Sequence, residues 1–319
     1  MILVTGGAGY IGSHCVLALL NRGLDVVIFD SLETGHIETV TTLKNVDSAG
    51  KVVDFIKGDL KNLDDIESVF EKYDIEAVIH FAALSLVGES VKEPQKYYYN
   101  NVYGTLNLLN AMLSHNVKKI VFSSTAATYG EPEYTPYGNT KLMVEKIMDD
   151  YSKAYDLKSV RLRYFNVAGA DSQARVGEWH EPETHLIPNI LKSTLGSGKT
   201  FELYGEDYPT KDGTCVRDYI NVEDLAQAHI LALEYLNNGG DTNYFNLGTK
   251  QGDTVKEVFT ACEKVTEQKI PVNMMPRRAG DPASLVADNT KAKTVLGWIP
   301  KNSLEDSIKT AYSWVLKNK

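Results

Sequence analysis

The chain has 319 residues, of which 43% are apolar and 24% charged, and its formal net charge is -9. This balance is that of an ordinary globular protein, and the length suits one large α/β domain with a smaller appendage. The acidic charge and the lack of a Lys/Arg block exclude a typical nucleic-acid partner. No apolar run reaches the about 18 residues that a membrane span needs.

The first half of the chain alternates between short apolar runs and stretches with helical spacing. We predict strands at Ile2–Thr5, Asp25–Asp30, Val52–Lys57, Ala77–Phe81, Lys119–Ser123 and Ser159–Tyr164. Between them we predict helices at Ile11–Arg22, Leu63–Lys72, Asn101–Ser114 and Leu142–Tyr155. Apolar strands separated by amphipathic helices indicate a parallel sheet covered on both faces, hence a doubly wound Rossmann sheet.

After Asn166 this rhythm breaks, and Gly, Pro, Asp and Glu become frequent. Helical spacing returns at Leu186–Leu195, Val222–Tyr235, Val255–Val265 and Leu304–Leu316. We therefore predict a Rossmann domain over 1–167 and a smaller α/β domain over 168–319, with some later segments returning to the first domain.

The three cysteines, Cys15, Cys215 and Cys262, lie far apart and form no CxxC pair. We expect buried thiols in a reducing compartment, without a disulfide framework or a zinc site. Met1 runs directly into the first predicted strand, so we expect no signal peptide and a cytoplasmic location. None of the seven histidines is assigned as a metal ligand, because His14 and His80 have no ligand at metal-binding spacing.

A glycine-rich loop follows the first strand and opens the first helix. Gly7, Gly9 and Gly12 match GxGxxG, and Gly6, Gly9 and Gly12 match GxxGxxG. Glycines allow the sharp turn and bring backbone N–H groups to a pyrophosphate, and the helix N-terminus attracts that anion. The strand and helix on either side make this a dinucleotide-binding loop rather than an ordinary turn.

Acidic residues end the second and third strands. Asp30 ends the second strand, where a carboxylate accepts hydrogen bonds from the adenosine ribose and repels a 2′-phosphate, which favours NAD over NADP. It could instead cap the next turn. The pair Asp59 and Leu60 lies where the third strand meets the adenine, although a Gly-Asp pair is also common in turns.

A Tyr and a Lys lie one helical turn apart at Tyr137 and Lys141. A phenol has a pKa of about 10 and is a poor base at neutral pH, so a nearby ammonium and a positive nicotinamide ring are expected to favour the phenolate. The fifth strand runs into Ser123-Ser124-Thr125, whose hydroxyls can hydrogen-bond the reacting oxygen and share its proton with Tyr137.

Ten segments in order along the chain resemble the UDP-glucose 4-epimerase family of extended short-chain dehydrogenases/reductases. They are TGGAGYIGS, IHFAALSLVGES, YYYNNVYGT, VFSSTAATYG, YGNTK, RYFNVAGA, ETHLIP, GTCVRDYI, NLGT and RRAGDPA. The resemblance covers nearly the whole chain, from Gly6 to Asp281.

The resemblance implies roles for individual residues. The catalytic hydroxyl falls on Thr125, and the catalytic pair on Tyr137 and Lys141. NAD contacts fall on Gly6, Gly7, Gly9, Tyr10, Ile11, Gly12, Asp30, Asp59, Leu60, Phe81, Asn100, Tyr137, Lys141 and Tyr164. UDP-sugar contacts fall on Thr125, Asn166, His185, Leu186, Tyr204, Arg217, Tyr219, Arg278, Asp281 and Leu285. Because an acidic protein needs local cations to bind a diphosphate, Arg217 and Arg278 suit that part of the site.

Two departures from the family pattern affect the substrate site, one at the sugar pocket and one at the UDP pocket. Thr125 and Tyr137 are only 12 residues apart, where the family mostly has a longer loop, so we expect a more open pocket. His185 replaces an Asn that is frequent in the family.

The resemblance predicts an epimerase that interconverts UDP-galactose and UDP-glucose through a 4-keto sugar, with transient hydride transfer to NAD. A UDP-N-acetylglucosamine 4-epimerase stays open as an alternative, because Leu285 is intermediate in volume. A 4,6-dehydratase is disfavoured, because related dehydratases carry Asp-Glu after the catalytic Thr, where this chain has Ala126-Ala127. An NAD-binding scaffold without activity is disfavoured because Tyr137 and Lys141 are both present.

The family also implies a homodimer that is held by a four-helix bundle. Apolar residues recur at helical spacing over Asn101–Ser114 and Lys141–Tyr155, namely Val102, Leu106, Leu109, Leu142, Ile147 and Tyr151. The same residues could instead cover the sheet, and spacing alone does not decide between the two.

Overall fold

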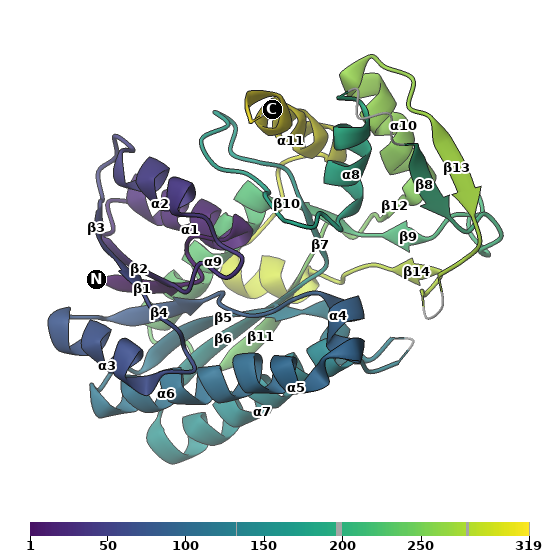
Figure 1. Cartoon of the computed structure of the whole chain (residues 1–319). Helices are drawn as coiled ribbons and strands as arrows, with labels where there is room; N and C mark the ends of the chain where they lie inside the picture. The colour runs from purple at the N-terminus through teal and green to yellow at the C-terminus, as the bar shows by residue number, and fades with distance from the viewer. Residues whose placement is uncertain (132, 196–199, 279–280, 319) are drawn as a thin grey trace. The chain divides into compact units, whose positions relative to one another are not determined.

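A computed structural model describes residues 1–131, 133–195, 200–278 and 281–318 (Figure 1). The chain divides into two units. The first comprises Met1–Arg163, Ala226–Phe245 and Val295–Trp298, and the second comprises Tyr164–Leu225, Asn246–Thr294 and Ile299–Lys319. The predicted division into a Rossmann domain over 1–167 and a smaller domain over 168–319 stays a prediction.

A seven-stranded sheet is the centre of the first unit. Its spatial order is β11 (Asn243–Leu247), β6 (Lys158–Tyr164), β5 (Lys119–Thr125), β4 (Ala77–His80), β1 (Ile2–Thr5), β2 (Val26–Asp30) and β3 (Val52–Lys57). The pairs β1–β2, β2–β3, β1–β4 and β4–β5 are parallel. The order 3-2-1-4-5-6 is that of a dinucleotide-binding Rossmann sheet, whose ligand binds where the strand order reverses, between β1 and β4. The predicted α/β class with a doubly wound sheet is therefore confirmed.

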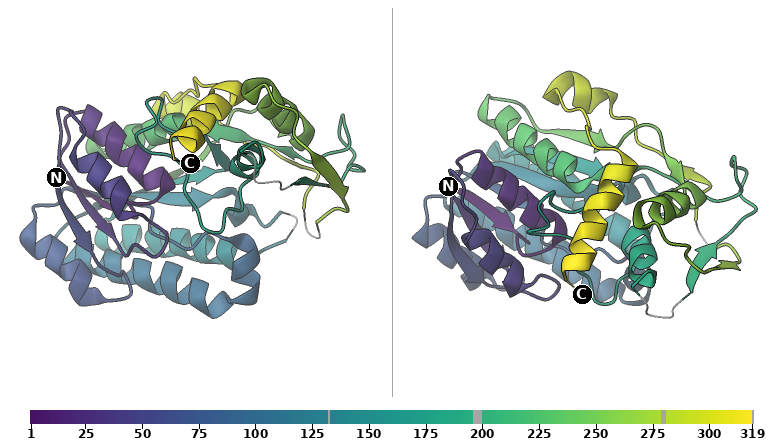
Figure 2. Two further views of the ribbon diagram at one scale, coloured as in Figure 1. Left: turned by 45° about the horizontal axis from the view of Figure 1, so that its top comes forward. Right: turned by 90° about the horizontal axis from the view of Figure 1, so that it is seen from above.

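Helices cover both faces of this sheet, which explains why every residue of β1, β2 and β4 is buried. One face is covered by α3 (Leu63–Lys72), α6 (Gly104–Ser114) and α7 (Pro136–Tyr155), which share a buried apolar cluster with the strands. On the other face lie α1 (Tyr10–Asn21), α2 (Ile37–Lys44) and most of α9 (Val222–Asn237) (Figures 1 and 2).

Short helical segments complete the first unit. Between β4 and α6 the chain forms α4 (Val87–Lys92), α5 (Pro94–Tyr97) and a π-helix, η1 (Tyr98–Tyr103). A 3-10 turn, η2 (Ala126–Tyr129), follows β5, and a second π-helix, η3 (Ala292–Leu296), begins in the second unit and ends in the first. All six predicted strands are present within a few residues of their predicted bounds, whereas β11, α2 and α4 were not predicted.

In its described residues, the second unit is built mainly from three helices and three small sheets. The helices α8 (Leu186–Ser193), α10 (Val255–Thr266) and α11 (Leu304–Lys317) share one buried apolar cluster. The sheets pair β7 (Asn166–Ala168) with β10 (Tyr219–Asn221), β8 (Phe201–Tyr204) with β13 (Val272–Met275), and β9 (Val216–Arg217) with both β12 (Asp253–Thr254) and β14 (Ser284–Leu285). Capping boxes at Thr254 and Ser303 satisfy the first backbone N–H groups of α10 and α11.

None of the helices in the described part of the chain combines the length and apolar character that crossing a bilayer requires.

Candidate active site

The glycine-rich loop between β1 and α1 needs its glycines for steric reasons. Gly6 has φ +73°, and a Cβ there would lie 2.6 Å from the backbone nitrogen of Ala82. A Cβ on Gly12 would lie 2.1 Å from the carbonyl oxygen of Gly6, whereas Gly9 has room for one. The loop therefore passes close to the chain after β4, at the point where the sheet order reverses, and leaves the N-terminus of α1 open to a pyrophosphate.

Tyr10 and Ile11 begin α1 beside this loop, and Tyr10 is buried. The first turn of α1 carries no acidic side chain, so nothing there opposes an anion. The predicted phosphate-binding residues are thus all brought together by one tight turn, and the arrangement fits a dinucleotide.

Asp30 ends β2 and is 7% exposed. Its Oδ2 accepts a hydrogen bond from the Ala8 N–H (3.0 Å), and its Oδ1 accepts one from the Leu32 N–H (2.9 Å). Burial raises the pKa of this carboxyl, and the two backbone hydrogen bonds oppose that shift. The carboxylate is therefore tied to the phosphate loop itself, at the place where a ribose would follow the pyrophosphate.

The other predicted cofactor residues of the first unit follow β3 and β4 or, in the case of Asn100, lie in η1. Asp59 is engaged locally, because it accepts from the Lys61 N–H (2.8 Å) and lies 3.2 Å from the Lys61 ammonium. Leu60 is buried, and Phe81 follows β4 with its ring centroid 4.6 Å from that of His229. Asn100 lies in η1 and donates to the side chain of Asn101 (3.0 Å).

Thr125 and Tyr137 are brought together by the short connection between β5 and α7. Thr125 ends β5, and its Oγ1 accepts from the Ala127 N–H (3.2 Å). A Cβ on Gly138 would lie 2.4 Å from the Ala127 carbonyl oxygen, so the first turn of α7 packs directly on η2. This close approach brings the phenol of Tyr137 near Thr125, whose hydroxyl lowers the pKa of the phenol.

Electrostatics at the Tyr–Lys pair differ from the sequence-based expectation. Burial raises the pKa of Tyr137 to about 12, and the hydrogen bond to Thr125 opposes that shift. The Lys141 ammonium donates to the Ser123 carbonyl oxygen (2.8 Å) and lies over the Phe122 ring. Burial lowers the pKa of Lys141 to about 7, and the charge of Glu145 opposes that fall. The protein alone thus holds the phenol neutral and Lys141 near its titration point.

Glu145 is a residue that the sequence analysis missed. It lies one turn beyond Lys141 on α7, and its side chain is 5% exposed. Its carboxylate accepts from the Ser124 hydroxyl (2.5 Å) and from two guanidinium nitrogens of Arg163. The i, i+4 spacing after Lys141 was a signal for it, because such residues share a helix face.

In the second unit, two of the predicted UDP-binding residues form an ion pair. Arg217 is mostly buried; it donates to the Val216 (2.8 Å) and Pro282 (2.9 Å) carbonyl oxygens and lies 3.4 Å from Asp281. The guanidinium of Arg278 stacks over the ring of Tyr204 at 4.1 Å. Two residues of the RRAGDPA motif, Ala279 and Gly280, lie outside the described residues.

The remaining predicted substrate residues are placed by β7, β10, β14 and α8. Asn166 on β7 lies opposite Tyr219 on β10, and Leu285 on β14 lies opposite Arg217 on β9. His185 occupies the N-cap position of α8 without a side-chain capping hydrogen bond, and Leu186 begins that helix. Tyr164, which was predicted to contact NAD, ends β6 and is buried.

Asp218, between Arg217 and Tyr219, is a second residue that the sequence analysis missed. It is fully buried, and its carboxylate accepts from the backbone N–H groups of Thr249 (2.7 Å) and Ala287 (3.1 Å). It therefore fixes the chain on which Arg217 and Tyr219 lie. Its position inside the charged RDY triplet was the only signal in the sequence.

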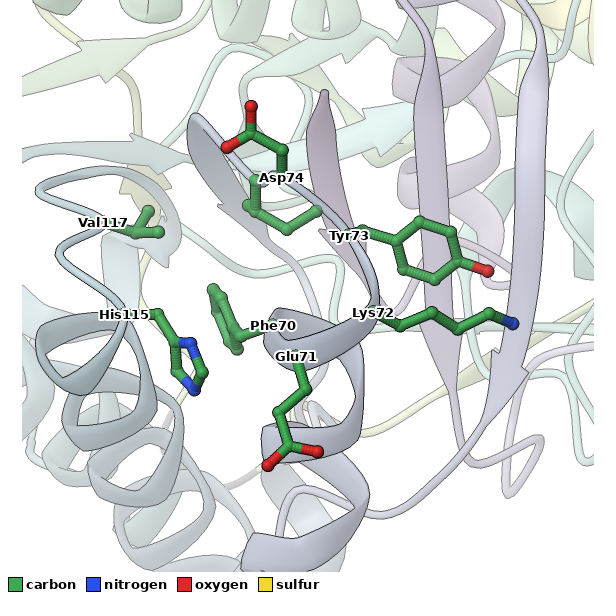
Figure 3. Close-up of a pocket in the computed structure, with 8 residues that line it drawn as sticks. Phe70, Glu71, Lys72, Tyr73, Asp74, His115 and Val117 are labelled. Carbon is green, nitrogen blue, oxygen red and sulfur yellow. The ribbon is translucent and has the colours of Figure 1, made fainter.

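A pocket of about 270 Å³ lies elsewhere in the first unit (Figure 3). It is lined by the end of α3 and by the segments that precede β4 and β5, including Phe70, Tyr73, Asp74 and His115. These segments enter the sheet at the amino ends of its strands. Ligands of doubly wound sheets bind at the carboxyl ends, so this pocket is separate from the glycine-rich loop and from Thr125.

The fold and the Thr–Tyr–Lys arrangement define a short-chain dehydrogenase/reductase of the extended kind. A family profile described as GDP-mannose 4,6 dehydratase matches residues 3–311. The UDP-glucose 4-epimerase of Halalkalibacterium halodurans is 51% identical over an alignment of 326 positions, which covers 98% of this chain and 95% of that protein.

Solved structures agree with this likeness. The UDP-glucose 4-epimerase from Brucella ovis in complex with NAD is 44% identical with a TM-score of 0.91, covering 98% of this chain and 97% of that one. The enzyme from Bifidobacterium longum in complex with NAD+ and UDP is 39% identical with a TM-score of 0.90, covering 99% and 98%. This chain belongs to the UDP-glucose 4-epimerase family.

Proposed function

We propose that this chain is an NAD-dependent isomerase that interconverts UDP-galactose and UDP-glucose by inverting the sugar C4. The observation that carries the proposal is the placement of Thr125 at the carboxyl end of β5 and of Tyr137 in the first turn of α7, which packs on η2, with Lys141 one turn further along that helix. The family likeness extends over nearly the full chain, and family members have been crystallised with NAD and with UDP.

Residues of the first unit would hold NAD, and their geometry fits that group. The glycine-rich loop, whose backbone approaches Ala82 and itself too closely for larger residues, would take the pyrophosphate. Asp30 would accept hydrogen bonds from the adenosine ribose, and Lys141 would hold the nicotinamide ribose. When bound, NAD supplies a positively charged ring that accepts a hydride from the sugar C4 and returns it.

Residues of the protein handle the proton of the 4-hydroxyl. Tyr137 Oη would accept that proton, and Thr125 Oγ1 would hydrogen-bond the same sugar oxygen. Because burial raises the pKa of Tyr137 to about 12, ionisation of the phenol at neutral pH requires positive charge close to it. This account predicts that Tyr137 becomes an effective base only in the fully assembled complex.

Residues of the second unit would bind the UDP group. We assign the diphosphate to Arg217 and Arg278 and further contacts to Asn166, His185, Leu186, Tyr204, Tyr219 and Asp281. The stacking of Arg278 on Tyr204 supports this assignment, because it orients a guanidinium that would otherwise be free to rotate.

A 4,6-dehydratase is the second candidate, since the matching family profile has that description. Elimination of water at C5 and C6 needs an acid and a base next to the catalytic hydroxyl. Thr125 is followed by Ala126 and Ala127, whose side chains cannot transfer protons. The profile match therefore supports the superfamily and not that reaction.

The test is to incubate purified protein and NAD with UDP-galactose and to identify the product by NMR. The proposal predicts UDP-glucose, together with a loss of about 10²–10⁴ in rate for Tyr137→Phe and a slower reaction for Thr125→Val. A 4-keto-6-deoxy product would favour the dehydratase, and near-normal epimerisation by Tyr137→Phe would refute the role of the phenol.

We also infer a homodimer in which α6, α7 and η1 meet their counterparts. Tyr99, Tyr103 and Met143 on these helices are 54%, 43% and 45% exposed. Tyr99 and Tyr103 stack with ring centroids 5.0 Å apart. Of the six residues with helical spacing, Leu109 is fully buried against the sheet, whereas Val102, Leu106, Leu142, Ile147 and Tyr151 are only partly buried. Light scattering that shows a monomer at micromolar concentration would contradict the dimer.

We also propose a reducing, cytoplasmic location. Its support is the sequence spacing of Cys15, Cys215 and Cys262, which lie far apart and form no CxxC pair, and all three are buried.

A further inference from the structure

Four ligand-type side chains converge in the segment that leads into α8. The side chains of Glu178, His180, Glu183 and His185 each offer one ligand atom, and all four atoms lie within 4.8 Å of one another. The Nδ1 atom of His180 lies 3.3 Å from Glu178 Oε1 and 3.8 Å from Glu183 Oε1. The Nδ1 atom of His185 is hydrogen-bonded to Glu178 Oε1 and lies 3.8 Å from Glu183 Oε1.

These separations match a four-coordinate metal site. With metal–nitrogen and metal–oxygen bonds of about 2.0–2.1 Å, the ligand atoms of a tetrahedron lie about 3.4 Å apart. The separations between imidazole nitrogen and carboxylate oxygen scatter around that value, and all four ligand atoms lie within 4.8 Å of one another. A single ion would bring the two 3.8 Å separations and the shorter His185–Glu178 contact to a common length.

The charges also match. Two carboxylates with two neutral imidazoles carry a charge of -2, which would neutralise a divalent ion. Both carboxylate side chains are only 5% exposed. Imidazole and carboxylate together suit Zn²⁺ and similar transition metals, whereas Mg²⁺ and Ca²⁺ prefer oxygen ligands alone.

Surrounding contacts hold the ligands in place. Glu183 Oε1 accepts from the backbone N–H groups of Thr184 (2.9 Å) and His185 (3.0 Å). The Glu178 carbonyl oxygen accepts from the Trp314 indole (3.0 Å), and Gly177 packs on the same indole too closely for any Cβ. Outer contacts of this kind orient the ligands in metal sites.

We propose that Glu178, His180, Glu183 and His185 form a binding site for one divalent transition-metal ion of the Zn²⁺ type, which ties the segment before α8 together. Without an ion, the same four groups form an ion-pair cluster, in which the carboxylates raise the pKa of His180 to about 9 although burial alone would lower it. The cluster and the metal site are distinguishable by binding. The Lys192 ammonium lies 3.5 Å from Glu183 Oε2. The two imidazoles lie near the other oxygen of that carboxylate, Oε1.

The experiment uses the full-length protein without a histidine tag. After treatment with a chelator and its removal, Zn²⁺ is titrated against the protein with a competing fluorescent chelator, and bound metal is counted by mass spectrometry. A parallel titration with Co²⁺ reports geometry, because four-coordinate Co²⁺ absorbs visible light far more strongly than the hydrated ion.

The variants are His180→Gln, Glu183→Gln and His185→Asn. His185→Asn is the safest of these for folding, because that side chain is 48% exposed. His115→Gln is the matched control, since it removes a histidine that is paired with Glu67 at 2.7 Å in the other unit. Circular dichroism and NAD binding verify that each variant is folded.

The proposal predicts one Zn²⁺ per parent chain and an intense Co²⁺ spectrum. It also predicts a loss of at least about 100-fold in Zn²⁺ affinity for His185→Asn and unchanged binding for His115→Gln. The parent protein tests the proposal even where a variant does not fold. No binding to the parent at micromolar Zn²⁺, or equal affinity in parent and His185→Asn, would overturn the site and leave an ion-pair cluster alone. Neither result depends on epimerase activity.

Discussion

Replacing Glu145 by Gln removes the charge that faces both Arg163 and Lys141. In the parent, the Glu145 carboxylate accepts from the Ser124 hydroxyl and from two nitrogens of Arg163, whose side chain is 12% exposed. The amide of Gln keeps one acceptor oxygen and turns an NH₂ group toward donors. The Arg163 guanidinium then stays buried without a negative partner.

The expected loss of stability is large. Removing one partner of a buried ion pair costs about 3–5 kcal/mol, because the remaining charge is left uncompensated. The aromatic rings of Tyr129 and Tyr244, which lie 5.0 and 4.2 Å from the Arg163 guanidinium, place the result near the lower end of that range. Since whole domains are stable by about 5–15 kcal/mol, this one substitution removes a substantial share.

The catalytic pair responds as well. Glu145 opposes the fall in the pKa of Lys141, so the Gln variant lowers that pKa further below about 7. If the reaction needs protonated Lys141, the fall of activity toward high pH begins at a lower pH in the variant.

Urea unfolding at pH 7 measures the loss of stability, and a pH–rate profile measures the shift in the pKa of Lys141. Asp150→Asn is the matched control on the same helix, because its partner Lys153 and Asp150 itself are 77% and 79% exposed. Such an exposed pair contributes about 0–1 kcal/mol. A loss below about 1 kcal/mol for Glu145→Gln, equal to the control, would refute the buried ion pair as a main support of α7.

Three further predictions follow from single residues. Asp30→Asn should weaken NAD binding by about 10–100-fold, because it removes charge-assisted hydrogen bonds, and should narrow the preference for NAD over NADP. Isothermal titration with both cofactors measures the two affinities. An unchanged preference for NAD would contradict the assignment of Asp30 to the adenosine ribose. His80 is fully buried, and burial lowers its pKa to about 3, so the unfolded chain protonates this histidine as the pH falls below 6.5 while the folded chain does not. The free energy of unfolding is therefore undiminished by His80 above pH 6.5 and is lower by about 2 kcal/mol at pH 5. Urea unfolding of the parent and of His80→Gln at pH 7 and pH 5 should show that difference only in the parent. We expect the parent to have a lower kcat/KM on the N-acetylated UDP-sugars than on UDP-glucose and UDP-galactose. Leu285→Tyr should selectively depress kcat/KM for the N-acetylated sugars, and Leu285→Ala should raise that kcat/KM by an amount worth about 1–3 kcal/mol. If the ratio of the two kcat/KM values is the same in all three proteins, the selectivity lies elsewhere.

Local patterns predicted the elements of the Rossmann sheet well. The strands of the first half are buried apolar runs between amphipathic helices, so period and composition both pointed to them. β11 was missed because Asn243–Leu247 is short and half polar, and only its pairing beside β6 reveals it as a strand. The π-helix η1 was read as the start of α6, since side-chain spacing does not distinguish the two.

The site was predictable in its residue types but not in its contacts. The i, i+4 spacing placed Tyr137 and Lys141 on one face of α7, yet it could not show that Lys141 reaches the Ser123 carbonyl oxygen. Likewise, the pattern Glu178-x-His180-x-x-Glu183-x-His185 has no helical or strand period. Its four side chains meet only because the segment turns back on itself before α8. Both outcomes depend on tertiary contacts that sequence spacing does not encode.

The most direct test of the proposed reaction follows the hydrogen on the sugar C4. UDP-galactose deuterated at C4 is incubated with the protein and NAD in ordinary water, and the UDP-glucose formed is analysed by NMR and mass spectrometry. Because the account moves only the hydroxyl proton through Tyr137 and returns the C4 hydrogen to the same sugar as hydride, it predicts that deuterium stays on C4 of the product. UDP-glucose that carries solvent hydrogen at C4 would contradict the account.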